Sequence, residues 1–351
     1  MITHLLFLGV VLLVSFRKHK RIGLVLAFIA LFVFAAIRYN FGSDYPAYFE
    51  NFLKIKAGLT IYGDQIFFEL LNRYSPSYYF LIAVTSAVTV YTFYWLIKKH
   101  VTENCWPLAL LILLINPYLF LMSLSAIRQT LSMCLFIFSI YFAYKRKPIP
   151  YLVLIAFASL FHTSALLLLP VYFFANDRKF GKSFSVITVV VTIVLLVSTS
   201  FFSNIIERFL SVIDESNYWY YYNQDEGNSL RSLILSSVYF IYVIINIPYL
   251  KGKTLVFSKL YLFATICALL AYQVSMITRV QQYFDIFSIV SLPMIMSANV
   301  ERCKGLRLMN IINRYIFPAL IFVIYVLRYY SFFTNPLWKS FAEYHTIFEV
   351  L

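Results

Sequence analysis

The sequence predicts an all-α, polytopic membrane protein. Its 351 residues are 62% hydrophobic, 20% aromatic and only 13% charged, whereas a soluble domain is roughly half apolar and about a quarter charged. The apolar excess runs along most of the chain, which excludes a soluble enzyme, a disordered tail and a nucleic-acid-binding module. We expect a single membrane-embedded domain over residues 1–351, with about 10–12 transmembrane helices, one of them a split or re-entrant hairpin.

The apolar segments are long enough for membrane helices. A helix needs about 20 apolar residues to cross roughly 30 Å of hydrocarbon. Several segments begin or end in Tyr, Trp or Phe, which favour the membrane interface. The expected spans are residues 2–16, 22–37, 79–97, 106–122, 126–144, 184–202, 233–250, 257–277, 283–298 and 311–330.

One apolar segment, 148–175, is interrupted by His162, Thr163 and Ser164. As one helix it would be a long span, whereas two arms of about 14 and 13 residues would each rise only about 20 Å. Cytosolic loops carry an excess of Lys and Arg. A segment that goes out and returns places most basic residues inside, and a single crossing divides them almost evenly. The charges therefore favour the hairpin.

The net charge of +14, from 29 Lys+Arg and 15 Asp+Glu, is an orientation signal on this interpretation. The first apolar run precedes a basic cluster at 17–21, which suits a first span with its N-terminus outside. The outer side then carries the loops 38–77 and 203–232. In the first of these we expect short interfacial helices, with Glu69 and Arg73 as an ordinary i,i+4 surface pair.

Ionisable residues next to apolar spans are costly and mark candidate sites. The first such motif runs from Arg38 through Gly42 and Asp44 to Tyr45 and Tyr48. Gly42 permits a tight turn, so that Arg38 and Asp44 can approach one another. The alternative is an interfacial arginine that extends toward the head groups, but Asp44 and the tyrosines favour function.

The second motif is Ser123-Leu-Ser-Ala-Ile-Arg128-Gln129, at the outer start of the fifth span. A bound anion could use both the guanidinium of Arg128 and the free backbone N–H groups of a helix N-terminus. The alternative is again an interfacial anchor.

The third and fourth motifs lie later in the chain. Phe161-His162-Thr-Ser164 occupies the tip of the hairpin, where short arms would leave His162 inside a polar cavity; a lone histidine is also often structural. On a helix, Arg279 shares a face with Gln282 and Tyr283 while Asp285 points elsewhere. The alternative for Arg279 is a structural ion pair with an acidic residue.

Three arginines, a histidine and an aspartate in one outer cavity suit a polyanionic lipid head group, because the arginine fork matches phosphate oxygens. Tyr45, Tyr48 and the aromatic run at 218–222, which includes Trp219, could stack on sugar rings, or the run could be an interfacial belt. The sequence has no Asp-x-Asp pair or His/Cys cluster, and its four cysteines lack metal-binding spacing. We expect a metal-independent reaction and no cofactor.

The ordered set of four motifs resembles the EpsG-like branch of the Wzy polysaccharide polymerases. The matching residues are Arg38…Gly42-x-Asp44…Tyr48, Ser125-Ala-Ile-Arg128-Gln129, Phe161-His162-x-Ser164-Ala165 and Arg279…Tyr283. The resemblance implies a GT-C-like glycosyltransferase in the bacterial inner (cytoplasmic) membrane, with its active site facing the periplasm or the outside. The loop 203–232 matches no family pattern and is a candidate for sugar specificity.

The resemblance also implies roles for these residues. Asp44, His162, Arg128 and Arg279 would be catalytic, with Asp44 slightly favoured over His162 as the base. Diphosphate binding falls to Arg38, Arg128, Arg279 and Gln129, and sugar binding to Tyr45, Tyr48, Tyr283 and Trp219. The implied partners are undecaprenyl-diphosphate-linked oligosaccharides, the lipid bilayer and a chain-length regulator protein, and no nucleic acid.

Two other classes remain open on the sequence. A flippase for the same lipid-linked sugar needs access from both faces, and therefore charges spread through the depth of the membrane. Here they gather toward one side, which favours an enzyme. A membrane O-acyltransferase would carry an external catalytic histidine with acidic partners, an arrangement that the sequence lacks.

Overall fold

The computed structural model of the chain describes residues 4, 7–9, 11–12, 19–178, 182–197, 230–272, 277–302 and 311–349. The chain divides into two compact units. Unit 1 comprises Met1–Phe142, Pro148–Leu166 and Tyr325–Leu351, and unit 2 comprises Ala143–Lys147 and Leu167–Ile324. Trp219, and most of the loop at 203–232 that contains it, lie outside the described residues.

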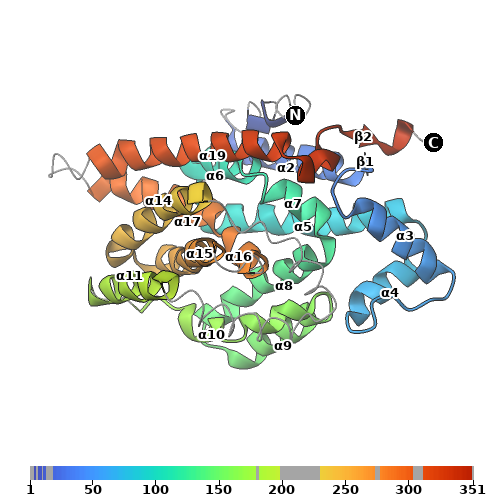
Figure 1. The fold of residues 1–351 in the computed structure, drawn as a ribbon, viewed down its shortest axis with the longest axis horizontal. Coiled ribbons are helices and arrows are strands. Elements are labelled where there is room, and N and C mark those ends of the chain that lie inside the picture. Colours follow the sequence, from blue (N-terminus) through green and yellow to red (C-terminus); the bar gives the residue numbers. More distant parts are fainter. Residues whose placement is uncertain are drawn as a thin grey trace. The chain divides into compact units, whose positions relative to one another are not determined.

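Unit 1 is helical, and segments far apart in the chain meet in it (Figure 1). Its helices are α2 (Lys20–Ala36), α3 (Tyr45–Lys56), α4 (Ile66–Tyr74), α5 (Tyr78–His100), α6 (Trp106–Ile115), α7 (Phe120–Ser125), α8 (Ile127–Tyr144), α9 (Pro148–Ser159) and the end of α19 (Phe317–Thr334). The 3₁₀ turns η1 (Glu103–Cys105), η5 (Pro336–Phe341) and η6 (Ile347–Glu349) and the two-residue strands β1 (Arg38–Tyr39) and β2 (His345–Thr346) complete it. Helix α2 packs against α5, and β1 pairs with β2.

Helix α5 is the long apolar helix against which α2 packs (Figure 1). Ser77 caps its N-terminus by accepting a hydrogen bond from the backbone N–H of Phe80, at 3.1 Å. Its last turn holds Lys98, Lys99 and His100, which suit the negative end of the helix dipole. A buried stripe of small hydroxyl side chains follows one face of α5: Thr85, Ser86, Thr89 and Thr92.

Unit 2 is arranged around α15 (Gly252–Leu270), which contacts four other helices of this unit. These are α11 (Lys182–Val197), α14 (Leu230–Asn246), α16 (Ile277–Asp285) and α17 (Ser288–Arg302). The shorter elements are α10 (Val171–Phe174), η3 (Ile247–Tyr249) and η4, a π-helical turn (Ile312–Ile316); η2 (Thr163–Leu168) runs from unit 1 into unit 2. The buried Lys259 of α15 donates hydrogen bonds to the backbone oxygens of Asn176 (2.9 Å) and Arg178 (2.7 Å).

The prediction of an all-α, polytopic membrane protein is confirmed. Five helices in the described part of the chain are long and apolar enough to span a membrane: α5, α8, α15, Leu230–Tyr249 and Ile312–Thr334. Five shorter apolar helices accompany them, at Glu103–Ile115, Pro148–Ser159, Thr163–Phe174, Ser185–Leu196 and Ser288–Ala298. The described strands are limited to one antiparallel pair, β1 with β2.

Several expected spans are divided in the structure. The segment 106–122 splits into α6 and α7, because the residue before a proline disfavours helical backbone and Asn116, which precedes Pro117, has a ψ of 101°. The segment 283–298 is interrupted between α16 and α17. The predicted break at His162 is present, since α9 ends at Ser159 and η2 begins at Thr163. Helix α9 has 12 residues and therefore rises only about 18 Å.

Candidate functional site

The first two motifs lie against each other in unit 1. The chain turns sharply at Gly42, whose φ of +114° is in the left-handed region that favours glycine. A Cβ at this position would approach the Cα and Cβ of Ser125 to 3.4 Å. The hydroxyl of Ser125 in turn accepts a hydrogen bond from the backbone N–H of Asp44, at 3.0 Å. The motif at 38–48 therefore packs directly on the motif at 123–129.

Arg38 is buried inside this junction. Its side chain is 1% exposed and donates hydrogen bonds to the backbone oxygen of Ala35, to the hydroxyl of Ser86 (2.8 Å) and to the backbone oxygen of Leu124 (3.0 Å). These bonds connect the ends of α2 and α7 to the hydroxyl stripe of α5. Burial lowers the pKa of Arg38 to about 10, which leaves the guanidinium charged at neutral pH.

The turn at Gly42 forms as predicted, but it does not bring Arg38 to Asp44. Among the described residues, the hydrogen bonds of Arg38 go to Ala35, Ser86 and Leu124, and Asp44 is exposed just before α3. Two backbone carbonyls and a hydroxyl attract the guanidinium inward, where it satisfies acceptors at helix ends. Arg38 thus holds the turn, and its contact with a diphosphate stays a prediction.

The C-terminal segment braces the same motif. Strand β2 pairs antiparallel with β1, with Arg38 opposite Thr346. The Ser340 hydroxyl lies 3.1 Å from that of Ser43, and the Tyr344 hydroxyl donates to the backbone oxygen of Phe34 at 2.6 Å. The Tyr344 ring also stacks on the Phe34 ring at 4.3 Å between centroids. Residues about three hundred positions apart in the chain therefore fix the position of the first motif.

Arg128 contacts residues of the first motif and of the loop before α4. It is the second residue of α8 and is half-buried. Its guanidinium donates to the Oε1 atom of Gln65 at 3.0 Å and to the Tyr48 hydroxyl at 3.4 Å. Its guanidinium carbon lies over the Tyr62 ring, 4.9 Å from the centroid, and 5.8 Å from that of Tyr48. These contacts orient the guanidinium.

Two tyrosines beside Arg128 are buried and protonated. Burial raises the pKa of Tyr62 to about 12 and raises the pKa of Tyr48, while the nearby guanidinium of Arg128 acts on both in the opposite direction. Each side chain therefore meets the cation as a neutral ring, and Tyr48 accepts a hydrogen bond from it. The hydroxyl of Tyr62 accepts a hydrogen bond from Nδ2 of Asn51 at 2.9 Å.

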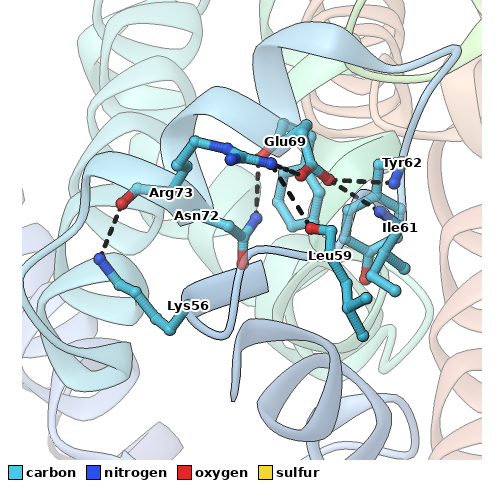
Figure 2. Close-up of polar contacts among 8 residues, drawn as sticks. Lys56, Leu59, Ile61, Tyr62, Glu69, Asn72 and Arg73 are labelled. Atoms are coloured by element: carbon cyan, nitrogen blue, oxygen red, sulfur yellow. Dashed lines mark hydrogen bonds and ion pairs between the residues drawn. The ribbon is translucent and has the colours of Figure 1, made fainter. Parts of the chain in front are cut away.

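The loop between α3 and α4, which carries Tyr62 and Gln65, is fastened by Glu69 (Figure 2). The pair of Glu69 with Arg73 forms as predicted, at 3.0 Å. Its expected place on the surface was wrong, because Glu69 is only 5% exposed. Its carboxylate accepts hydrogen bonds from the backbone N–H groups of Ile61 and Tyr62, at 3.3 and 3.0 Å. These backbone N–H groups stabilise the carboxylate in its buried position, and the i,i+4 spacing does not reveal them.

The third motif joins the first two through apolar packing. Tyr45 and Tyr48 share a hydrophobic cluster with Ile127 of α8, and Phe161 packs against this cluster. Phe161 and Phe157 also contact the ring of Phe67, with centroids 5.6 and 5.5 Å away. His162, the next residue, is 7% exposed. Residues from three of the four motifs therefore border one cluster of unit 1.

The fourth motif lies in unit 2, on α16. The predicted helix is present, with Tyr283 buried and Arg279, Gln282 and Asp285 half-buried. Ile277 and Val280 of the same helix pack against Cys267 and Ala271, which are at and just beyond the end of α15. The structure thus places Arg279 on a helix of unit 2, and its meeting with Arg128 stays a prediction.

The residues expected to stack on sugars are mostly enclosed. Tyr45 and Tyr48 are 4% and 6% exposed and Tyr283 is 1% exposed, so their rings pack chiefly against protein. Gln129 is half-buried beside Arg128. The described residues include no group of three or more His, Cys, Asp or Glu side chains that could hold a metal ion.

Three residues of this site were missed by sequence reasoning: Tyr62, Gln65 and Ser86. Tyr62 and Gln65 come from an irregular loop with no periodicity, and Ser86 lies in an apolar helix. The hydroxyl residues repeated along α5 were the one available signal of a polar face. Their partners Arg128 and Arg38 come from distant parts of the chain, which only folding brings near.

Comparison with known families identifies the family of the chain. The family model described as EpsG family matches residues 21–346, which contain all four motifs. The chain belongs to the EpsG family. Membership indicates a role of the polysaccharide-polymerase type, and the apolar helices agree with a multi-pass membrane protein of this family. No curated protein and no solved structure matches the chain.

Proposed function

We propose that this EpsG-family protein is a glycosyltransferase that polymerises oligosaccharide repeat units carried on undecaprenyl diphosphate. The reaction would take place at the outer face of the bacterial cytoplasmic membrane. The observation that carries the proposal is the position of Arg128, which is half-buried and oriented by Tyr48, Tyr62 and Gln65. A fixed, partly desolvated guanidinium is suited to the diphosphate of a lipid carrier.

In the proposed reaction a hydroxyl oxygen of the acceptor repeat unit attacks the anomeric carbon of the donor glycan. A new C–O glycosidic bond forms, and the bond between the anomeric carbon and the diphosphate oxygen breaks. The electron pair leaves with the diphosphate, and the hydroxyl proton passes to a base. Negative charge grows on the leaving oxygen, so a fixed cation stabilises the transition state more than the ground state.

Arg128 is proposed to stabilise this leaving group. Asp44 is proposed as the base because it is exposed beside the same motif junction and its backbone is fixed by Ser125. His162, which follows Phe161 in the chain, is proposed to orient the phosphate or to take the proton instead. Arg279 keeps its role in diphosphate binding on the family pattern, and the half-buried Gln129 beside Arg128 could add a donor.

The direct test uses purified protein in detergent with an undecaprenyl-diphosphate oligosaccharide and no added metal. The wild-type protein should produce a ladder of longer glycans on a gel, and Arg128→Ala and Arg279→Ala should not. Arg21→Ala is the matched control, because Arg21 has an exposed side chain that pairs with Glu103 at 2.9 Å, away from the motifs. A ladder of wild-type intensity from Arg128→Ala would refute the diphosphate role.

Experiments in cells separate polymerase from flippase. With the native gene replaced by Arg128→Ala, single repeat units should collect on the outer surface, since their export would continue. Accumulation on the cytosolic leaflet would identify a flippase instead.

The proposed orientation can be tested with a membrane-impermeant maleimide. In a cysteine-free background, Ser43→Cys should react from outside the cell and Lys147→Cys should not. The reverse pattern would overturn the outward-facing site.

A further inference from the structure

Glu69 is a buried and hydrogen-bonded carboxylate that has no role in the proposed reaction. Its side chain is 7% exposed, and the carboxylate receives three N–H donors among the described residues. Two are the backbone groups of Ile61 and Tyr62, and the third is the Arg73 guanidinium at 3.0 Å. A buried carboxylate is stable only when it is hydrogen-bonded. The three donors therefore stabilise Glu69, and the charge of Glu69 strengthens its bonds to them.

The loop held by Glu69 is mostly exposed. Residues 57–60 and Gly63 and Asp64 are exposed, and Tyr62 is the one buried side chain between α3 and α4. Arg73 adds a longer bond to the Leu59 backbone oxygen, at 3.4 Å, and Lys56 donates to the Arg73 backbone oxygen at 2.7 Å (Figure 2). Tyr62 adds its place in the hydrophobic cluster and the bond from Asn51. The carboxylate of Glu69 binds the loop backbone at two successive N–H groups.

This loop supplies two of the contacts that orient Arg128. The Tyr62 ring lies 4.9 Å from the guanidinium carbon, and Oε1 of Gln65 accepts its hydrogen bond at 3.0 Å. The backbone links the two, since the Gln65 N–H donates to the Tyr62 oxygen at 2.9 Å. Glu69 bonds directly to the Tyr62 backbone, so we expect a change at Glu69 to reach Tyr62 and Gln65, two of the residues that contact Arg128.

We propose that Glu69 is a positioning residue for Arg128. It fixes the loop 57–65, and the loop fixes the guanidinium in the orientation that the polymerase reaction requires. The catalytic part of this inference rests on the proposed function. The structural part, that Glu69 sets the position of Arg128, can be measured without any turnover.

The test compares Glu69→Gln with Glu50→Gln. Both replace a glutamate of the region 38–77 by its neutral isostere, and both break an i,i+4 pair. Glu50 lies on the surface, where it pairs with Lys54 at 2.7 Å with a side chain 66% exposed. Glutamine at 69 keeps the volume, but its NH₂ group cannot accept a hydrogen bond, so at least one of the present donors loses its partner.

The first measurement is the rate at which phenylglyoxal modifies Arg128, followed by peptide mass spectrometry on the folded protein. Glu69→Gln should raise this rate several-fold, and Glu50→Gln should leave it unchanged. An unchanged rate in a Glu69→Gln protein that elutes as folded would overturn the proposal. This result holds whether or not the protein is a polymerase.

The second measurement is the rate of ladder formation against lipid-linked oligosaccharide concentration, per amount of folded protein. Glu69→Gln should lower kcat on the order of tenfold to a hundredfold, the usual cost of a misplaced catalytic group. KM should change less, because the lost contact strengthens in the transition state. In an Arg128→Lys background, which is expected to keep part of the activity, Glu69→Gln should lower the rate less than it does in the wild-type protein. An undiminished additional loss would overturn action through Arg128.

The two proposals fail in different ways. If the wild-type protein makes no ladder, or Arg128→Ala retains it, the proposed function fails, and the modification rate alone decides the role of Glu69. If Arg128→Ala abolishes the ladder while Glu69→Gln is fully active, Glu69 fails as a positioning residue and the proposed function stands.

Discussion

The guanidinium carbon of Arg128 lies 4.9 Å from the centroid of the Tyr62 ring. Arg128 belongs to α8 and Tyr62 to the loop before α4, so the contact joins two segments that are distant in the chain. A cation over an aromatic face is worth about 0.5–2 kcal/mol, more when the pair is desolvated. Here it fixes the orientation of the cation that we assign to the leaving diphosphate.

The geometry of the Arg128 guanidinium should matter more for the reaction rate than its charge alone. Arg128→Lys keeps a cation, but an ammonium cannot bond Gln65 and Tyr48 in the same geometry. We expect the initial rate of ladder formation to fall about tenfold or more, equivalent to about 1.4 kcal/mol of transition-state stabilisation. The control is Arg21→Lys, on an exposed pair with Glu103. Equal rates for wild type and Arg128→Lys would count against a forked contact.

The ring of Tyr62 should matter more than its hydroxyl. Tyr62→Phe removes the hydrogen bond from Asn51 (2.9 Å) and keeps the face beneath Arg128. Tyr62→Leu removes both, and should lower the rate several-fold further because about 0.5–2 kcal/mol of cation–π interaction is lost. The rates of the two variants, each normalised to folded protein, check this. If Leu and Phe give the same rate, the ring does not position the guanidinium.

The junction of the first two motifs should be intolerant of a Cβ at Gly42. Gly42→Ala forces an alanine to φ +114° and brings its Cβ to 3.4 Å from Ser125. Left-handed backbone costs an L-residue about 1–2 kcal/mol, and the Cβ would lie in van der Waals contact with Ser125. Thermal unfolding in detergent should therefore begin at a lower temperature, and activity should fall as Asp44 shifts away from Ser125.

Gly58 provides the matched control for Gly42. Its φ is +96°, and a Cβ built on it would meet nothing within 4 Å. Gly58→Ala therefore carries the backbone strain without a side-chain contact. The difference between the two variants isolates the contact with Ser125, and identical unfolding and activity would show that this contact is unimportant.

The stability of the C-terminal segment that pairs with the first motif should depend on pH through His345. Interaction with Glu349 (2.9 Å) and Glu343 (3.6 Å) raises the pKa of His345 above its ordinary value of 6.5, and the same histidine lowers the pKa of Glu349 below 4.5. The histidine contribution is fully present below pH 6.5 and is lost as the pH rises through the raised pKa. The Glu349 contribution is present above pH 4.5 and is lost as the pH falls through the lowered pKa.

The stabilisation should therefore be greatest in mildly acidic solution, between those two values. The difference in thermal midpoint between wild type and His345→Gln, measured from pH 4 to pH 9, should peak there and decline on both sides. A difference that does not vary with pH would show that protonation of His345 has no part in stabilising this segment. Lys54→Gln, on the surface pair with Glu50, serves as the control for loss of a surface charge.

Much of the fold could be predicted from the sequence. The helical character and the membrane class follow from apolar runs, since burying backbone polar groups in lipid requires helices. The break at His162 was predicted from polar residues in an apolar segment. The division of 106–122 was not predicted, because the apolar length of a segment does not reveal the local break that Pro117 causes at Asn116.

The sequence by itself determined the membrane class, the family and the four motifs, because composition and short ordered patterns are properties of the chain alone. Only the tertiary structure decided that Arg38 is enclosed by helix ends and that Glu69 is buried, and it alone revealed Tyr62 and Gln65 as partners of Arg128. The physical reason is distance along the chain. Which acceptor a guanidinium reaches depends on segments that meet only after the helices pack, and no local spacing encodes that choice.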